Sequence, residues 1–169
     1  MLVSPLHRAI ETAALTLAGL EDSVSIDVCR HARELFWHNG ENALGGAEEA
    51  RALLRQLNVS GAAWRSMGGM GSIDCAFNGD SSEQEHASIA ALQAVLRGRT
   101  EQTILIVCHW GVIEKLCGEK VNNGVLVECE RSRVSGQLRV LSRREAALTG
   151  ESAHSAMSHS AAQVALLAE

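Results

Sequence analysis

The stretch that decides the fold is Thr103-Ile104-Leu105-Ile106-Val107-Cys108-His109-Trp110-Gly111. It opens with five consecutive apolar or β-branched residues, and a histidine and a glycine follow near its end. A run without polar alternation is typical of a buried parallel strand, because both faces of such a strand are covered. In open α/β sheets, ligands bind just beyond the carboxyl ends of these strands. His109 is therefore a candidate site residue, and a core histidine satisfied by its neighbours is the alternative that this stretch leaves open.

The segments around this strand predict an α/β fold with a mostly parallel sheet flanked by helices on both faces. Apolar residues at helical spacing, capping residues and stop glycines predict four helices, at 5–17, 47–57, 82–97 and 112–117. β-Branched and apolar runs predict five strands, at 2–3, 23–28, 103–107, 124–130 and 137–141. The last two strands are predicted to form a hairpin at the edge of the sheet, and residues 61–80 a long surface loop.

The chain divides at residue 141 by composition. Residues 1–141 are predicted to form one domain, which suits the total length of 169 residues. Residues 142–169 are rich in Ala and Ser, and we expect a tail that is disordered or is helical only around 161–168.

Charge and cysteine content exclude several classes of function. The net charge is −5, so neither nucleic acid nor an anionic membrane is expected as a partner. No apolar run approaches the roughly 20 residues that a membrane span needs, and the N-terminus does not resemble a signal peptide. The five cysteines are scattered and odd in number, which predicts free thiols and a cytoplasmic location.

A second informative stretch is Ser4-Pro5-Leu6-His7-Arg8-Ala9-Ile10-Glu11-Thr12. Ser4 is predicted as an N-cap and Pro5 as the first helical residue, directly after a strand end. Arg8 then lies in the first helical turn, where its guanidinium and free backbone N–H groups can bind one anion together. The alternative is a solvated arginine on an amphipathic helix.

Together, the two stretches resemble the histidine phosphatase superfamily, the phosphoglycerate-mutase-like proteins. Ser-Pro-Leu-x-Arg-Ala-x-x-Thr is similar to that family's second-arginine motif. A strand followed by Cys-His-x-Gly and an apolar helix is similar to its second-histidine motif. The two motifs occur here in the family's order, about 100 residues apart, and the resemblance covers roughly residues 2–130.

The resemblance implies a pocket for a phosphoryl group and no metal or other cofactor. Arg8 would bind phosphate oxygens, and His109 would stabilise the charge on those oxygens with help from the main-chain N–H of Trp110. Glu34 takes the place of the family's proton donor, with Glu41 as the fallback. The expected ligand is a small phosphorylated molecule or inorganic phosphate.

The family's nucleophile is a histidine in an Arg-His-Gly triplet, which precedes the second-arginine motif and which this sequence does not contain. We therefore expect an N-terminally truncated domain with impaired phosphoryl transfer. Arg30-His31-Ala32 imitates the triplet, but it follows the arginine motif and lacks the glycine. The alternative function is a non-catalytic module that binds a phosphorylated ligand.

No metal site is predicted. One candidate group is Cys29, His31 and His38, and the other is Cys108, His109 and Cys117. Neither group has the paired spacing of metal ligands.

Overall fold

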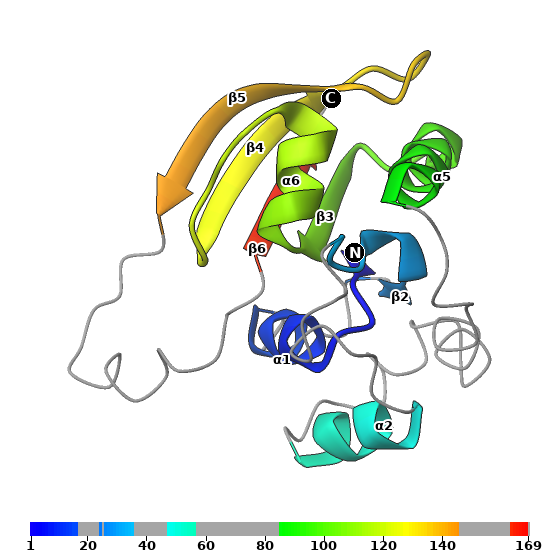
Figure 1. Cartoon of the computed structure of the whole chain (residues 1–169), viewed down its shortest axis with the longest axis vertical. Coiled ribbons are helices and arrows are strands. Elements are labelled where there is room, and N and C mark those ends of the chain that lie inside the picture. Colours follow the sequence, from blue (N-terminus) through cyan, green and yellow to red (C-terminus); the bar gives the residue numbers. More distant parts are fainter. Residues whose placement is uncertain (17–23, 25, 36–46, 57–84, 146–162, 169) are drawn as a thin grey trace.

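The computed structural model describes residues 1–16, 24, 26–35, 47–56, 85–145 and 163–168 (Figure 1). These residues form a mixed α/β structure. Its elements in chain order are β1 (Leu2–Val3), α1 (His7–Thr16), β2 (Asp27–Val28), the 3-10 helix η1 (Arg30–Ala32), α2 (Ala47–Gln56), α5 (Glu85–Gly98), β3 (Thr103–Cys108), α6 (Trp110–Cys117), β4 (Val125–Arg131), β5 (Leu138–Glu145) and β6 (Gln163–Ala168).

The strands form one sheet in the order β2-β1-β3-β6-β4-β5. The first three strands are parallel to one another. β6 runs antiparallel to β3 and parallel to β4, and β4 and β5 form the predicted antiparallel hairpin at the edge. The prediction of a mostly parallel sheet is thus confirmed only for the part built by β2, β1 and β3, because the remaining strands make the whole sheet mixed.

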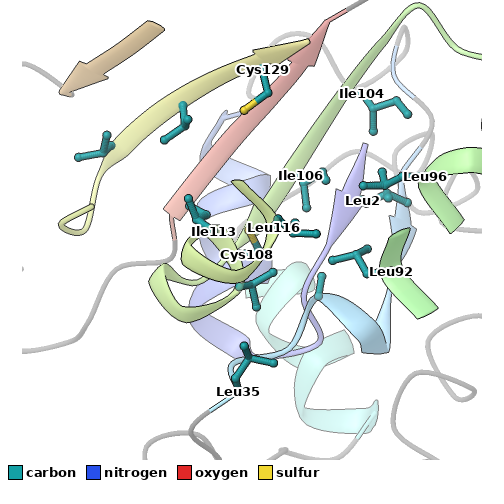
Figure 2. Packing of buried hydrophobic residues seen from close by; sticks show 14 residues of the cluster. Leu2, Leu35, Leu92, Leu96, Ile104, Ile106, Cys108, Ile113, Leu116 and Cys129 are labelled. Atoms are coloured by element: carbon teal, nitrogen blue, oxygen red, sulfur yellow. The ribbon is translucent and has the colours of Figure 1, made fainter. Parts of the chain in front are cut away.

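Helices pack on both faces of the sheet and enclose two apolar cores. One core joins η1, α5 and α6 to side chains such as Leu2 and Ile106. The other joins α1 and α2 to Val3 and Val107, the next residues along the same two strands. Successive side chains of a strand point to opposite faces, so these two cores lie on opposite sides of the sheet. Figure 2 shows the first core.

The segment after β3 folds as its sequence predicts. α6 starts directly after His109, and its C-terminus is closed by Gly118 in the left-handed conformation, with φ of 78°. The N–H of Gly118 donates to the carbonyl of Glu114 at 2.8 Å. Glycine adopts this conformation without a Cβ clash, which fixes the end of the helix.

The start of α1 differs from the prediction. The helix begins at His7 rather than at Pro5. The hydroxyl of Ser4 accepts a hydrogen bond from the N–H of Leu6 at 3.3 Å, so Ser4 stabilises the turn before the helix and not the helix itself. The predicted apolar face of this helix is confirmed by the burial of Leu6, Ile10 and Ala13.

The prediction for the C-terminal part is wrong for the residues that the structure describes there, 142–145 and 163–168. β5 continues to Glu145, past the predicted strand end at residue 141. Residues 163–168 are a strand between β3 and β4, where a helix or a disordered tail was expected. Ala and Leu favour a helix locally, but pairing with a strand on each side outweighs this preference.

Some predictions fall on residues outside the described ranges. They include the loop at 61–80 and the capping residue Ser82. Within the described part of the chain, no helix is long and apolar enough to cross a membrane.

The central position of β6 gives the first prediction. Ala165 pairs with Ile106 on one side and with Val127 on the other. Proline at this position removes an N–H from the ladder, and we expect Ala165→Pro to lower the free energy of unfolding by about 3 kcal/mol or more. Urea unfolding followed by circular dichroism measures this change. Val134→Ser, at an exposed position, is the control and should change stability by less than about 0.5 kcal/mol. Equal stability of wild type and Ala165→Pro would contradict the central strand.

Candidate functional site

The predicted site residue His109 and the hydroxyl of Ser4 meet at the carboxyl ends of two parallel strands. Ser4 follows β1 and His109 follows β3, and the two strands pair in parallel with Val3 opposite Val107. The N–H of Ser4 donates to the carbonyl of Val107 at 2.9 Å, which continues the ladder to the edge of the sheet. This pairing brings together two residues that are 105 positions apart in the sequence.

The same place is the topological switch point of the parallel strands. β1 lies between β2 and β3. The chain leaves β1 through α1 to reach β2 on one side, and returns after α5 to β3 on the other side. α1 and α5 belong to the cores on opposite faces. Open α/β sheets bind ligands in the crevice at such a reversal.

His109 bonds through both ring nitrogens. Nδ1 lies 3.2 Å from Nη2 of Arg8, and Nε2 lies 2.7 Å from Oγ of Ser4. An arginine can only donate, so Nδ1 is the acceptor in the first contact. A neutral ring then carries its proton on Nε2 and donates it to Ser4. The two contacts together fix both the orientation and the tautomer of the imidazole.

Burial and the neighbouring charge keep this imidazole neutral. The residue is 3% exposed. Burial, and to a smaller extent the positive charge of Arg8, lower the pKa of His109 to about 3. Both causes penalise a second proton on the ring. His109 is therefore a neutral hydrogen-bonding group over the whole physiological pH range, and it holds Arg8 in place.

Ser4 is the site residue that sequence reasoning missed, since it was predicted only as a helix cap. It is completely buried. Its hydroxyl oxygen accepts from the N–H of Leu6 at 3.3 Å and faces Nε2 of His109 at 2.7 Å. The feature that could have predicted this role is the position of Ser4 one residue after β1, level with the end of β3. We use the name strand-end site for Ser4, Arg8 and His109.

Glu34 lies at the same end of the sheet, after η1. It is 4% exposed, and its Oε1 accepts a hydrogen bond from the N–H of Leu35 at 2.8 Å. Its charge raises the pKa of Cys108, the residue before His109, although burial is the larger cause of that shift. The structure therefore brings Glu34 near the strand that carries His109.

Trp110 is the first residue of α6, and its side chain is exposed to 41%. The first N–H groups of an α-helix have no acceptor within the helix, and they carry the positive end of its dipole. The backbone of Trp110 thus places donors directly after His109. The contribution of its main-chain N–H to an anion site stays a prediction.

His31 lies in η1, after the short strand β2. Glu41 and His38, which entered the sequence analysis as alternatives, lie outside the described ranges. Among the described residues, no group of three or more His, Cys, Asp or Glu side chains is arranged to hold a metal ion.

Comparison with known proteins leaves the family open. No protein-family model, no curated protein and no solved structure matches the chain.

The low pKa of His109 gives a prediction for stability against pH. The unfolded chain binds a proton at this residue below about pH 6.5, whereas the folded chain does so only near pH 3. The stabilisation is complete above pH 6.5 and falls as the pH drops towards 3, by at most about 1.4 kcal/mol per pH unit. Urea unfolding from pH 7 to 4 should show the wild type losing stability faster than His109→Asn. Parallel curves would contradict a neutral, buried His109.

Removing the Ser4 hydroxyl tests the other contact of the ring. Ser4→Ala leaves the buried Nε2–H of His109 without its acceptor, and we expect a loss of about 1–3 kcal/mol. The control is Thr12→Ala, which also removes a hydroxyl. The hydroxyl of Thr12 donates to the carbonyl of Arg8 one helical turn away. Its removal should lower the free energy of unfolding by less than about 1 kcal/mol. Thermal and urea unfolding of both variants measure the difference. Equal losses would mean that the Ser4 hydroxyl has no special role.

Proposed function

We propose that the strand-end site binds the phosphate group of a small phosphorylated molecule, or inorganic phosphate, as the phosphate pocket of a histidine-phosphatase-like domain. The observation that carries this proposal is the contact between Arg8 and His109. These residues are 101 positions apart, and each belongs to one of the two motifs that resemble the family. Their meeting at the switch point of the parallel strands supports a shared ligand site.

Arg8 supplies the charge for this binding. Its Nη2 lies 3.2 Å from Nδ1 of His109. The planar guanidinium suits two parallel bonds to phosphate oxygens, and holding it in place before binding reduces the entropy lost on association. The N-terminal turn of α6 adds backbone donors and the positive end of a helix dipole at the same edge of the sheet.

His109 supports Arg8 in this proposal. With Nδ1 accepting from Arg8 and Nε2–H directed at Ser4, the neutral ring positions the guanidinium. The family resemblance assigns His109 the stabilisation of the phosphate charge, and the neutral ring would serve that role through the guanidinium that it orients.

The architecture and composition fit this function. Parallel strands with helices on both faces are the arrangement that the phosphoglycerate-mutase-like fold requires around its pocket. The net charge of −5 favours a small ligand held by one local cation over a nucleic acid held by a broad basic surface.

Phosphoryl transfer is the second candidate function, and the position of Glu34 favours it. A buried carboxyl group near the end of β3 could serve as a general acid for the leaving oxygen. Transfer through phosphohistidine also needs a nucleophilic histidine, and the sequence has no Arg-His-Gly triplet. Losing a nucleophile lowers the rate by orders of magnitude. Binding is therefore the function that we place first.

Phosphate binding is tested with matched arginine variants. Inorganic phosphate should bind to the wild type in isothermal titration calorimetry, and Arg8→Ala should weaken binding by about tenfold or more, because a charge-assisted contact contributes about 1.5–3 kcal/mol. Arg139→Ala is the control, since this arginine lies on the edge strand β5 and pairs with Glu130 of β4. Equal affinities for the wild type and Arg8→Ala would overturn the proposal.

A separate assay distinguishes transfer from binding. The wild type is incubated with p-nitrophenyl phosphate, and released nitrophenol and acid-labile phosphohistidine are measured. Turnover with a phosphohistidine that disappears in His31→Ala would establish transfer by this chain. Phosphate binding without turnover would establish the non-catalytic module.

A further inference from the structure

A large exposed aromatic residue adjoins the strand-end site. Trp110 directly follows His109 in the chain and is the first residue of α6. It is 41% exposed, whereas His109 is 3% exposed. The Cα–Cβ bonds of an α-helix are tilted towards its N-terminus, which for α6 is the edge of the sheet where Ser4 and His109 lie. The backbone therefore carries an indole to the edge of the proposed phosphate site.

The packing of α6 on the sheet is achieved by other side chains. Val112, Ile113 and Leu116 are buried in the core on this face of the sheet, and Figure 2 shows the last two. Among the residues that the structure describes, Trp110 is the only Phe, Trp or Tyr. Burying an indole would remove more apolar surface from water than burying an aliphatic side chain. A role in ligand binding explains why this residue lies at the site and not in the core.

An arginine and a tryptophan at one site recognise different parts of a ligand. In the proposed function, the guanidinium of Arg8 binds the phosphate group. The face of an indole binds flat aromatic rings by stacking, in addition to the hydrophobic contact that any apolar group can make. An aromatic phosphomonoester carries both groups, with a single ester oxygen between phosphorus and the ring. Its ring therefore lies close to the phosphate that Arg8 would hold.

We propose that Trp110 determines the specificity of the strand-end site, and that the ligand is a small aromatic phosphomonoester whose ring stacks on the indole. This inference rests on the proposed phosphate binding and adds the chemical class of the organic group. Arg8 supplies affinity for any phosphate, since its charge acts on the phosphate oxygens alone. Trp110 distinguishes among phosphate esters by the shape and aromaticity of the attached group.

Three ligands test the class of the organic group: inorganic phosphate, cyclohexyl phosphate and phenyl phosphate. Their affinities for the full-length chain are measured by isothermal titration calorimetry at about pH 8, where all three are mainly dianions. Phenyl phosphate should bind about three- to tenfold more tightly than cyclohexyl phosphate, because the two groups are similar in size and only the phenyl ring is flat and aromatic. Inorganic phosphate should bind most weakly, since it has no group to contact the indole.

Variants of Trp110 test its role in this preference. Trp110→Ala should reduce the ratio of the affinities for phenyl and cyclohexyl phosphate to about one, and Trp110→Phe should retain most of it, because a phenyl side chain still stacks. Leu141→Ala, at an exposed apolar residue on the edge strand β5, is the matched control and should leave the ratio unchanged. In NMR spectra, the indole N–H signal that is missing in Trp110→Phe should shift more with phenyl phosphate than with inorganic phosphate.

The outcomes separate this inference from the proposed function. Binding of inorganic phosphate that depends on Arg8, together with equal affinities for phenyl and cyclohexyl phosphate, would overturn the role of Trp110 and leave the phosphate site in place. Absence of binding for all three ligands would overturn the phosphate site and this inference with it. A peptide with phosphotyrosine carries the same ring, and tighter binding of that peptide than of phenyl phosphate would overturn the assignment to a small molecule.

Discussion

The parallel pairing of β1 with β3 is the interaction on which the rest of the structure depends. Leu2 pairs with Ile106 and Val3 with Val107. The two side chains of each pair lie on the same face of the sheet, and the two pairs lie on opposite faces. Each pair therefore belongs to one of the two apolar cores. The same register sets Ser4 level with the end of β3. Fold and site therefore share one constraint, and a shift by a single residue would exchange the faces and separate Ser4 from His109.

In the resulting site, the neutral imidazole of His109 holds the charged guanidinium of Arg8. Burial makes a second proton on His109 costly, and Arg8 makes it costlier still. The imidazole responds by accepting from Arg8 and donating to Ser4, so both nitrogens are satisfied in the neutral form. A core histidine would also be satisfied in this way. What separates the two interpretations is the partner, since the guanidinium brings a charge to the switch point of the sheet, where a purely structural contact would not need one.

The parts of the fold that follow from the sequence are those where local patterns and long-range packing agree. The apolar run before His109 and the glycine after Cys117 were sufficient to place β3 and α6. The approach of Arg8 to His109 was expected from two motifs. β6 could not be foreseen, because residues such as Leu166 and Leu167 suit a helix equally well and become a strand only between β3 and β4. The role of Ser4 depends on His109, a tertiary neighbour that no local pattern encodes.

The direction of the strands also explains why the chemistry gathers on one side of the molecule. β2, β1 and β3 present their carboxyl ends at a single edge, and η1, α1 and α6 follow directly from these ends. β6 and β4 run the opposite way, so their carboxyl ends lie at the other edge. The three parallel strands thus bring residues such as Glu34, Arg8 and His109 to one edge of the sheet. The mixed part of the sheet supplies β4, and Val127 of this strand belongs to the same apolar core as Ile113 of α6. The sheet therefore has two parts. The parallel strands position the polar site residues, and the mixed part packs against α6.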